Sequence, residues 1–223
     1  LPAHPVFMKK LYKLCRENGI LFISEEVQQG FWRTGKMFSI EHYGIIPDGI
    51  ILGKSVGASL TLGCFIARSE IINSLPAPAH LFTMGANSVA CAAGIAAFDI
   101  YYSEEFQELL RTNIEVAEKC AAKLQEDHPD MVRGFRNLGL SMGIEIADPE
   151  GISDDDTIFK VLFHCYELGL IVISVAGNIL RIQPPLNIEP ELLSKGFSII
   201  DQSLKDYEQG LISDDVLKYK AGW

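Results

Sequence analysis

The sequence predicts an α/β domain with a parallel or mixed sheet and helices, followed by a small α+β domain. The first observation is the order of elements near the start. Residues 7–18 carry apolar residues at helical spacing, Gly19 ends this helix, and the apolar run 20–23 leads into polar residues. The second observation is a change of pattern further along, where a long amphipathic helix begins. We therefore expect one domain at 1–103 and a second at 104–223.

Three short apolar runs of the first domain are typical of strands buried in an α/β sheet. They are residues 20–23, 49–52 and 62–67. The helices expected around them are 7–18, 70–75 and 88–102. The last of these is rich in Ala and Gly, which favours close packing on a sheet. Ligands of α/β sheets gather at the carboxyl ends of the strands, so the residues that follow the first two runs are the first place to look for a site.

The second domain alternates amphipathic helices with short strands. Its long first helix is expected at 104–127, and the acidic residues 154–156 suit the start of another helix that runs to 168. The remaining expected elements are strands at 131–136, 140–146, 170–174 and 179–182 and a last helix at 189–208.

Composition excludes several classes of protein. The 223 residues are 48% hydrophobic and 22% charged, which is ordinary for a globular protein, and the net charge of −10 with no basic stripe argues against nucleic acid. Apolar runs stay well short of the roughly 20 residues of a membrane span. The first residues contain neither the basic nor the apolar region of a secretory signal, so a cytoplasmic protein is expected.

Cysteine and histidine are scattered, and no metal site is expected. An odd number of cysteines, scattered along the chain and without CxxC spacing, fits a reducing compartment. The cysteines stand at 15, 64, 91, 120 and 165, and the histidines at 4, 42, 80, 128 and 164.

Lys54 is the first candidate for chemistry. It comes directly after the expected strand 49–52, where burial would lower the pKa of its ammonium and so favour a Schiff base with a carbonyl. The simpler alternative, a surface lysine in a loop, is the commoner case. A nucleotide-binding P-loop is excluded, because its first glycine would have to stand where the chain has Asp48.

Three further candidates are weak when taken singly. Glu25, after the first strand, could pair with a protonated ring nitrogen, although an acidic surface loop is more common. Thr83 precedes a helix start and could bind phosphate or simply cap the helix. Arg181, flanked by apolar residues, would pair with a carboxylate that belongs either to the protein or to a substrate.

Taken in order, these segments resemble the class-III aminotransferases that depend on pyridoxal phosphate (PLP), which include the 4-aminobutyrate and ornithine enzymes. The resemblance spans nearly the whole chain and rests on residues 25–38, Glu41-His42-Tyr43-Gly44, Pro47-Asp48, Leu52-Gly53-Lys54-Ser55, 80–93, 139–145 and 180–186. It implies that the first domain is part of a fold-type I PLP-transferase large domain.

The resemblance also implies a role for each candidate residue. Lys54 matches the Schiff-base lysine, which moves a proton between the substrate α-carbon and the cofactor. Gln28 matches the residue that hydrogen-bonds the ring hydroxyl of PLP, and Thr83 matches a threonine that reaches the PLP phosphate of a neighbouring subunit. Arg181 matches the clamp for a substrate carboxylate. The implied partners are amino-acid and 2-oxo-acid substrates and a second subunit.

Two departures from the family pattern qualify these roles. Glu25 stands where the family has an Asp that pairs with the pyridine nitrogen, so its side chain is longer by one bond of about 1.5 Å. We expect the longer chain to weaken the cofactor as an electron sink. The family's phosphate cup and the aromatic residue that stacks on the ring belong to an amino-terminal half that has no counterpart here.

The leading hypothesis is a carboxyl-terminal portion of a class-III aminotransferase. It would act as a homodimer or together with a separate amino-terminal half. Racemisation is a close alternative, because the residues 77–83, 28–30 and 175–178 resemble isoleucine 2-epimerases, which are racemases on the same scaffold. A catalytically inactive remnant is the third reading.

Overall fold

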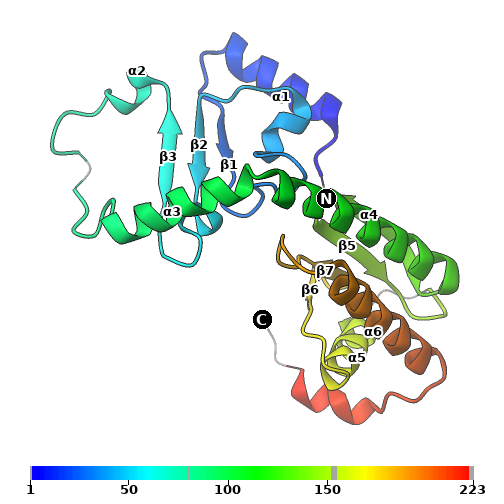
Figure 1. Cartoon of the computed structure of the whole chain (residues 1–223). Coiled ribbons are helices and arrows are strands. Elements are labelled where there is room, and N and C mark those ends of the chain that lie inside the picture. The colour runs from blue at the N-terminus through cyan, green and yellow to red at the C-terminus, as the bar shows by residue number, and fades with distance from the viewer. Residues whose placement is uncertain (1, 80, 152–154, 221–223) are drawn as a thin grey trace. The chain divides into compact units, whose positions relative to one another are not determined.

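The computed structural model describes residues 2–79, 81–151 and 155–220. Its contacts divide the chain into two compact units, Pro2–Glu108 and the part that begins at Leu109, and each is described by itself (Figure 1). The division falls inside one long helix, a few residues after the border expected at 103/104, and that domain border stays a prediction.

The first unit contains a small sheet with helices around it. Its elements, in chain order, are α1 (Pro5–Glu17), β1 (Ile23–Glu25), η1 (Ser39–Tyr43), β2 (Gly49–Leu52), η2 (Lys54–Gly57), β3 (Cys64–Ala67), α2 (Ser69–Ile72) and α3 (Ser88–Tyr101), where η marks a 3₁₀ helix. Helix α1 begins with Pro5 and is capped by His4, which accepts a hydrogen bond from the Val6 amide, and the chain leaves it through Gly19 at a left-handed φ of +65°.

The sheet of the first unit is mixed, in the order β1-β2-β3. Strands β1 and β2 are parallel, with Ile23 opposite Gly49 and Glu25 opposite Ile51, whereas β2 and β3 are antiparallel. The expected fold class, a partial large domain with a parallel or mixed sheet followed by an α+β region, is confirmed.

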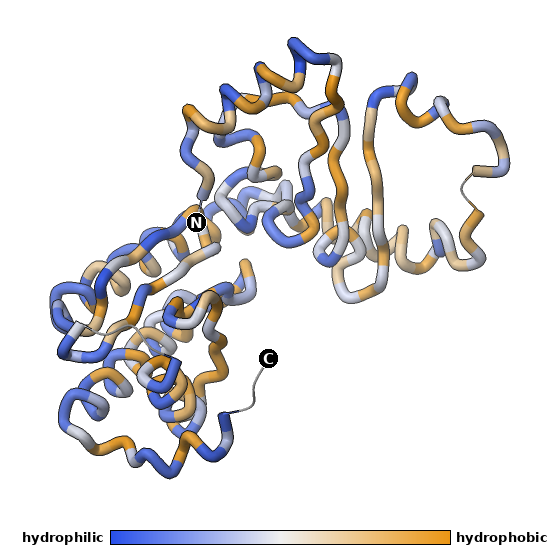
Figure 2. Tube along the Cα trace, turned by 180° about the vertical axis from the view of Figure 1, so that it is seen from behind, coloured by the Kyte–Doolittle hydropathy of each residue, from blue (hydrophilic) through white to orange (hydrophobic). Residues whose placement is uncertain are grey.

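The first strand corrects the sequence prediction. The strand runs over Ile23–Glu25 rather than 20–23, and it is not buried: Ile20, Leu21 and Ile23 are all exposed. Strand β3 likewise starts at Cys64, two residues later than expected, and has Phe65 and Ile66 exposed. Of the run 20–23 only Ile23 lies in a strand, and no described residues of this chain cover the exposed apolar residues of β1 and β3. Figure 2 shows the apolar residues along these strands.

The core of the first unit is small and aromatic. Phe31, Met37, Leu52 and Val56 are buried together. Rings of Trp32, Phe38, Phe98 and Tyr101 pack around them. The short side chains of α3 allow this helix to lie directly against the η2 turn, which follows strand β2.

Asp48 ties the peripheral elements of this unit together. Its side chain is only 3% exposed and accepts hydrogen bonds from the Phe22 amide, from Arg16 of α1 and from Arg68 beside α2, each at 2.8 Å. The hydrogen bond from Phe22 and the two guanidinium groups outweigh burial and hold the pKa of Asp48 below its usual value.

The second unit is an antiparallel sheet with helices. Strands β4 (Val132–Leu138), β5 (Ser141–Ile146), β6 (Ile173–Val175) and β7 (Ile179–Ile182) form a sheet in the order β4-β5-β7-β6. The helices are α5 (Asp155–Glu167), α6 (Pro190–Glu208), the 3₁₀ helix η3 (Asp214–Tyr219) and α4 (Glu104–Asp127), which begins in the first unit. The expected elements are present with small shifts at their ends, except that β6 begins at Ile173, three residues later than the strand expected at 170–174. Residue 154, the expected start of one helix, lies outside the described residues.

One face of the second sheet is buried in a continuous core. Alternate residues of β5, Met142, Ile144 and Ile146, point into it together with Leu180 of β7 and Val161 of α5. This is the alternation expected of an antiparallel sheet that is covered on one side.

Two histidines are held by carboxylates of α6. His128, which follows α4 and is 1% exposed, has its ring nitrogens 3.0 Å from Asp201 and 3.1 Å from Glu208. His164 of α5 lies 2.7 Å from Asp206 and 3.0 Å from Glu167. Burial lowers the pKa of His164, but the hydrogen bonds and charges of Glu167 and Asp206 outweigh it, so its pKa is raised.

No helix in the described part of the chain is long and apolar enough to cross a membrane. All five cysteine thiols are free.

Candidate functional site

The first two candidate residues lie at the same edge of the sheet. Glu25 is the last residue of β1, and Lys54 follows the last residue of β2 by two positions. Because β1 and β2 are parallel and Glu25 is paired with Ile51, both chains leave the sheet in the same direction. A carboxylate and an amine therefore follow neighbouring strands at their carboxyl ends, which is where α/β sheets bind ligands.

Lys54 has an unusual backbone. Its φ is +45°, in the left-handed region that side chains other than glycine rarely adopt, and the preceding Gly53 is fully extended. The burial expected from its strand-end position is absent, because the lysine side chain is exposed. Among the described residues nothing covers the Lys54 side chain, so its ammonium stays in contact with water.

The turn after Lys54 is short and closed by its own hydrogen bonds. The Val56 amide donates to the Gly53 carbonyl at 3.1 Å, and the Ala58 amide donates to the Ser55 carbonyl at 3.2 Å. Ala58 also has a positive φ of +52°, so the turn begins and ends on left-handed residues.

The two adjacent glutamates have different surroundings. Glu25 is exposed, and its side chain bends back to accept a hydrogen bond from the Val27 amide at 2.7 Å. Glu26 is 0% exposed and accepts hydrogen bonds from the Ser24 hydroxyl, the Ser39 amide and hydroxyl and the Ile40 amide, all between 2.7 and 2.9 Å. Glu26 therefore anchors the loop after β1, a role that its sequence position did not reveal.

Gln28 lies in the loop that Glu26 anchors, and it is exposed. The loop turns tightly: a side chain at Gly30 would bring its Cβ within 2.8 Å of the Glu26 carbonyl oxygen, and Phe31 and Trp32 both have positive φ values. The buried Phe31 then fixes the loop to Leu52 and Val56 on either side of Lys54. Glu25, Gln28 and Lys54 thus belong to segments that share one small core.

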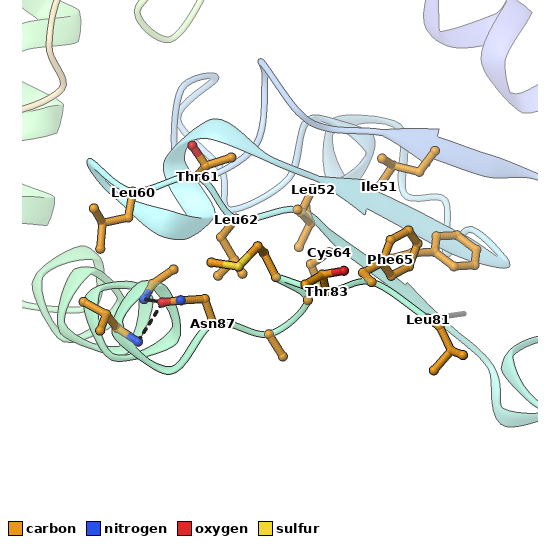
Figure 3. A pocket seen from close by; sticks show the side chains of 17 residues that line it. Ile51, Leu52, Leu60, Thr61, Leu62, Cys64, Phe65, Leu81, Thr83 and Asn87 are labelled. Carbon is orange, nitrogen blue, oxygen red and sulfur yellow. Dashed lines mark hydrogen bonds between the residues drawn. The ribbon is translucent and has the colours of Figure 1, made fainter. Parts of the chain in front are cut away.

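Thr83 lies in a different part of the same unit. It lines an open, mostly apolar groove between the segment 81–90 and strands β2 and β3 (Figure 3). In Figure 3 the residues Ile51, Leu52, Cys64 and Phe65 form one wall, and Thr83 stands on the opposite segment. Lys54, Glu25 and Gln28 do not line this groove.

The segment around Thr83 is almost fully exposed, including its neighbours Leu81, Phe82 and Met84. Helix α3 follows it and is capped by Asn87, whose side chain accepts hydrogen bonds from the Val89 and Ala90 amides. The cap of this helix is therefore Asn87 and not Thr83, which removes the simpler alternative for the threonine. His80, part of the same motif, lies outside the described residues.

Arg181 belongs to the second unit. It lies on β7 between Gly143 of β5 and Ile173 of β6, and its side chain is half-buried. Its guanidinium donates a hydrogen bond to the Gln183 side chain at 2.5 Å, and Gln183 in turn donates to Ser141 at 2.9 Å. Within the described parts of the chain no carboxylate forms an ion pair with Arg181, so the structural ion pair considered from the sequence is not made there.

Among the described residues, no group of three or more His, Cys, Asp and Glu side chains is arranged to hold a metal ion. The candidate chemistry is therefore that of an amine, a carboxylate and an amide at one sheet edge, a hydroxyl in a groove, and an arginine that has no carboxylate partner among the residues that the structure describes.

Comparison with known proteins assigns this arrangement to a family. The sequence pattern described as aminotransferase class-III matches residues 1–204. The chain belongs to the class-III aminotransferase family. Members of this family depend on PLP, which agrees with the amine and carboxylate at the ends of β1 and β2.

Two curated relatives of this class-III chain are amino-acid racemases in name. It is 38% identical over 226 residues to an isoleucine 2-epimerase of Lentilactobacillus buchneri, covering 100% of this chain and 50% of that protein. It is 36% identical over 219 residues to a leucine/methionine racemase of Thermococcus litoralis, covering 97% of this chain and 49% of the relative.

The fold is shared with a solved transaminase structure. An S-selective transaminase from Arthrobacter sp., crystallised with alanine bound, matches with a TM-score of 0.84 at 25% identity, over 94% of this chain and 49% of that one. The chain spans about half the length of the relatives it matches.

Proposed function

We propose that the protein is a PLP-dependent aminotransferase that moves an amino group between an amino acid, 4-aminobutyrate or a similar compound, and a 2-oxo acid. The observation that carries the proposal is the position of Lys54 and Glu25 at the carboxyl ends of adjacent parallel strands in a chain of this family. A reducing cytoplasm as its location is part of the same proposal.

The residues at the sheet edge fit the cofactor. Lys54 offers an exposed primary amine that can hold the aldehyde carbon of PLP. Glu25 offers a carboxylate for the ring nitrogen, and Gln28 an amide for the ring hydroxyl. When bound, PLP supplies an electron-poor ring that stabilises negative charge on the substrate α-carbon.

The chain's own residues would do the rest of the work. Lys54, once released from the cofactor, is the base that takes the α-proton through Nζ and later returns a proton as an acid. Arg181, whose guanidinium donates a hydrogen bond to the neutral Gln183 and forms no ion pair within the described residues, would bind a substrate carboxylate. Thr83 would reach the PLP phosphate of a neighbouring subunit from its exposed segment.

The site needs residues from outside this chain. Lys54 is exposed and the strands on which the site stands have uncovered apolar faces. A homodimer, or an assembly with an amino-terminal half, would supply the phosphate cup and the wall that excludes water.

Amino-acid racemisation or 2-epimerisation is a second candidate. It is favoured by relatives named as a leucine/methionine racemase, an isoleucine 2-epimerase and an alanine/serine racemase, each of which matches almost the whole chain. Racemisation uses the same removal of the α-proton but returns the proton to either face of the substrate. The residues named above suit both reactions.

Borohydride trapping tests the shared part of the proposal. The complete protein is loaded with PLP, reduced with borohydride and digested. The expected result is the cofactor on the peptide that contains Lys54. Lys54→Ala should lose the trapped cofactor and at least about 10²–10⁴-fold in turnover, whereas Lys36→Ala, at an exposed lysine of the same unit, should lose neither.

A colourless protein with no trapped cofactor would show a catalytically inactive remnant and sink the proposal. To separate the two reactions, a single L-amino acid is incubated without any 2-oxo acid. Appearance of the D or allo form identifies a racemase, and reaction only after a 2-oxo acid is added identifies an aminotransferase.

A further inference from the structure

Helix α3 packs against the η2 turn, which begins at Lys54. The stripe of α3 that faces the η2 turn consists of residues spaced at i, i+4, i+7 and i+11, so that they lie on one side of the helix. These residues are Ala90, Gly94, Ala97 and Tyr101, and the first three are buried.

Two consecutive carbonyl groups of the turn meet this stripe. The Tyr101 hydroxyl donates a hydrogen bond to the Ser55 carbonyl oxygen at 3.2 Å. The Val56 carbonyl oxygen lies so close to Gly94 that a Cβ there would be only 2.6 Å from it. Helix α3 therefore contacts the Ser55–Val56 peptide group by a hydrogen bond and the Val56–Gly57 peptide group by close packing.

Tyr101 is itself firmly placed. Its ring packs against Phe31, Phe98 and Phe106 with centroids 5.6 to 6.3 Å apart, and the Gln107 side chain donates to its carbonyl oxygen at 2.6 Å. Burial raises the pKa of Tyr101, which keeps its hydroxyl protonated and able to donate.

The held backbone is a strained one. A non-glycine residue in the left-handed region is energetically unfavourable and persists only where the surroundings fix it. Lys54 has φ +45°, and a relaxed φ would rotate the direction in which its side chain leaves the main chain. Ser55 directly follows Lys54, and its carbonyl oxygen accepts two hydrogen bonds. One comes from the Tyr101 hydroxyl and the other from the Ala58 amide, which closes the turn.

We propose that Tyr101 is a positioning residue for Lys54: its hydrogen bond to the Ser55 carbonyl holds the strained turn, and so aims the lysine amine at the cofactor and at the substrate α-proton. Tyr101 touches neither, and it acts through the backbone of Ser55. This inference rests on the proposed role of Lys54 and goes beyond it.

The test is Tyr101→Phe, which keeps the ring and removes only the hydroxyl. Tyr102→Phe is the matched control, because Tyr102 is the adjacent residue, is 63% exposed and packs its ring on Phe98, and its hydroxyl makes no hydrogen bond within the described parts of the chain. Both variants are made in the complete protein.

The first readout needs no cofactor. Hydrogen exchange of the Val56 and Ala58 amides, measured on cofactor-free protein, should become about fivefold faster in Tyr101→Phe, the effect of losing one neutral hydrogen bond. Tyr102→Phe should leave it unchanged. Equal exchange in Tyr101→Phe and the parent protein would overturn the proposal.

The second readout follows Lys54 in the loaded protein. In Tyr101→Phe the pH midpoint of the visible absorbance band of the lysine-bound cofactor should shift, and turnover should fall about fivefold with KM for the amino acid unchanged. Faster exchange together with an unshifted midpoint and normal turnover would make Tyr101 a merely structural residue and refute the proposal. A parent protein that binds no cofactor would instead refute the proposed function, while the exchange result still reports on the turn.

Discussion

The two units of the chain differ in how much of their apolar surface is buried. The unit from Leu109 onward buries one whole face of its sheet, and most of the largest fully buried side chains of the described residues belong to it. In the unit Pro2–Glu108, only Phe31 and Glu26 are in that class, and apolar residues of β1 and β3 face water. The unit with the smaller buried core is the one that carries Lys54, Glu25, Gln28 and Thr83.

This difference links the chemistry to the incomplete core. A site that must enclose a cofactor requires walls, and the unit that holds the candidate amine lacks them among the described residues. The first unit holds itself together with a few specific contacts, such as Asp48 with its two arginines and α3 against the η2 turn, rather than with a large core. Changes at such contacts should therefore cost more there than similar changes in the second unit.

The largest expected difference between the units comes from two glycine-to-alanine changes within helices. Gly94→Ala places a Cβ 2.6 Å from the Val56 carbonyl oxygen and should destabilise the first unit by about 1–3 kcal/mol through overpacking. Gly196→Ala on α6 meets only Leu170 at an ordinary 3.7 Å and should stabilise the second unit by up to about 1 kcal/mol.

Urea unfolding followed by amide hydrogen exchange checks this pair, because exchange reports the two units separately. A stabilising effect of Gly94→Ala would mean that α3 does not press on the η2 turn, and would remove the basis of the comparison.

The next effect is the response to pH, which should differ in sign. Folding lowers the pKa of Asp48. The stability that Asp48 contributes to the first unit is therefore present above pH 3.8, its ordinary pKa, and is lost as the pH falls through the lower pKa of the folded state. Folding raises the pKa of His164. The stability that His164 contributes to the second unit is therefore present below pH 6.5, its ordinary pKa, and is lost as the pH rises through the higher pKa of the folded state.

The variants that test this are Asp48→Asn and His164→Gln. Asp48→Asn should cost the first unit about 1–3 kcal/mol at neutral pH and flatten its acid dependence. His164→Gln should remove about 0.5–1 kcal/mol from the second unit at pH 6 and almost nothing at alkaline pH. A fall in stability of His164→Gln at alkaline pH as large as that at pH 6 would contradict the raised pKa.

The smallest expected effect is at Glu25. The proposed pairing of Glu25 with the cofactor nitrogen, weakened by the longer side chain, leads us to expect that Glu25→Asp in the complete protein raises turnover a few-fold without changing stability. Steady-state turnover and thermal unfolding measure the two quantities. If Glu25→Asp lowered turnover, the glutamate would be the better partner for the ring and this expectation would be wrong.

Local patterns were enough to predict most of the fold. Helical spacing and glycine stops placed α1, α3 and α4 almost to the residue, and apolar runs placed β2 and β7. The patterns could not show whether a strand is covered, which is why β1 was expected to be buried. The 3₁₀ helices, including the one that starts at Lys54, also escaped, since their short turns leave no periodic signal.

The candidate site was predictable only in part. The position of Lys54 after a strand is visible in the sequence, and its left-handed backbone is not. Gly94 and Tyr101 contact the turn across about forty positions of chain, and only the folded packing reveals such a contact. The sequence also does not separate Glu25 from its neighbour Glu26, whose burial and four hydrogen bonds only the folded structure shows.

The different surroundings of those two glutamates have a consequence for how the protein can vary. Glu26 is fixed by four donors in a closed space, so a shorter, longer or uncharged side chain there would leave buried hydrogen-bond donors unsatisfied and undo the loop. Glu25 is exposed, and within the described residues its side chain accepts a hydrogen bond from the Val27 amide alone, so its length can change without cost to the loop. The residue at position 25 can thus change without disturbing the loop after β1, because Glu26 maintains the conformation of that loop.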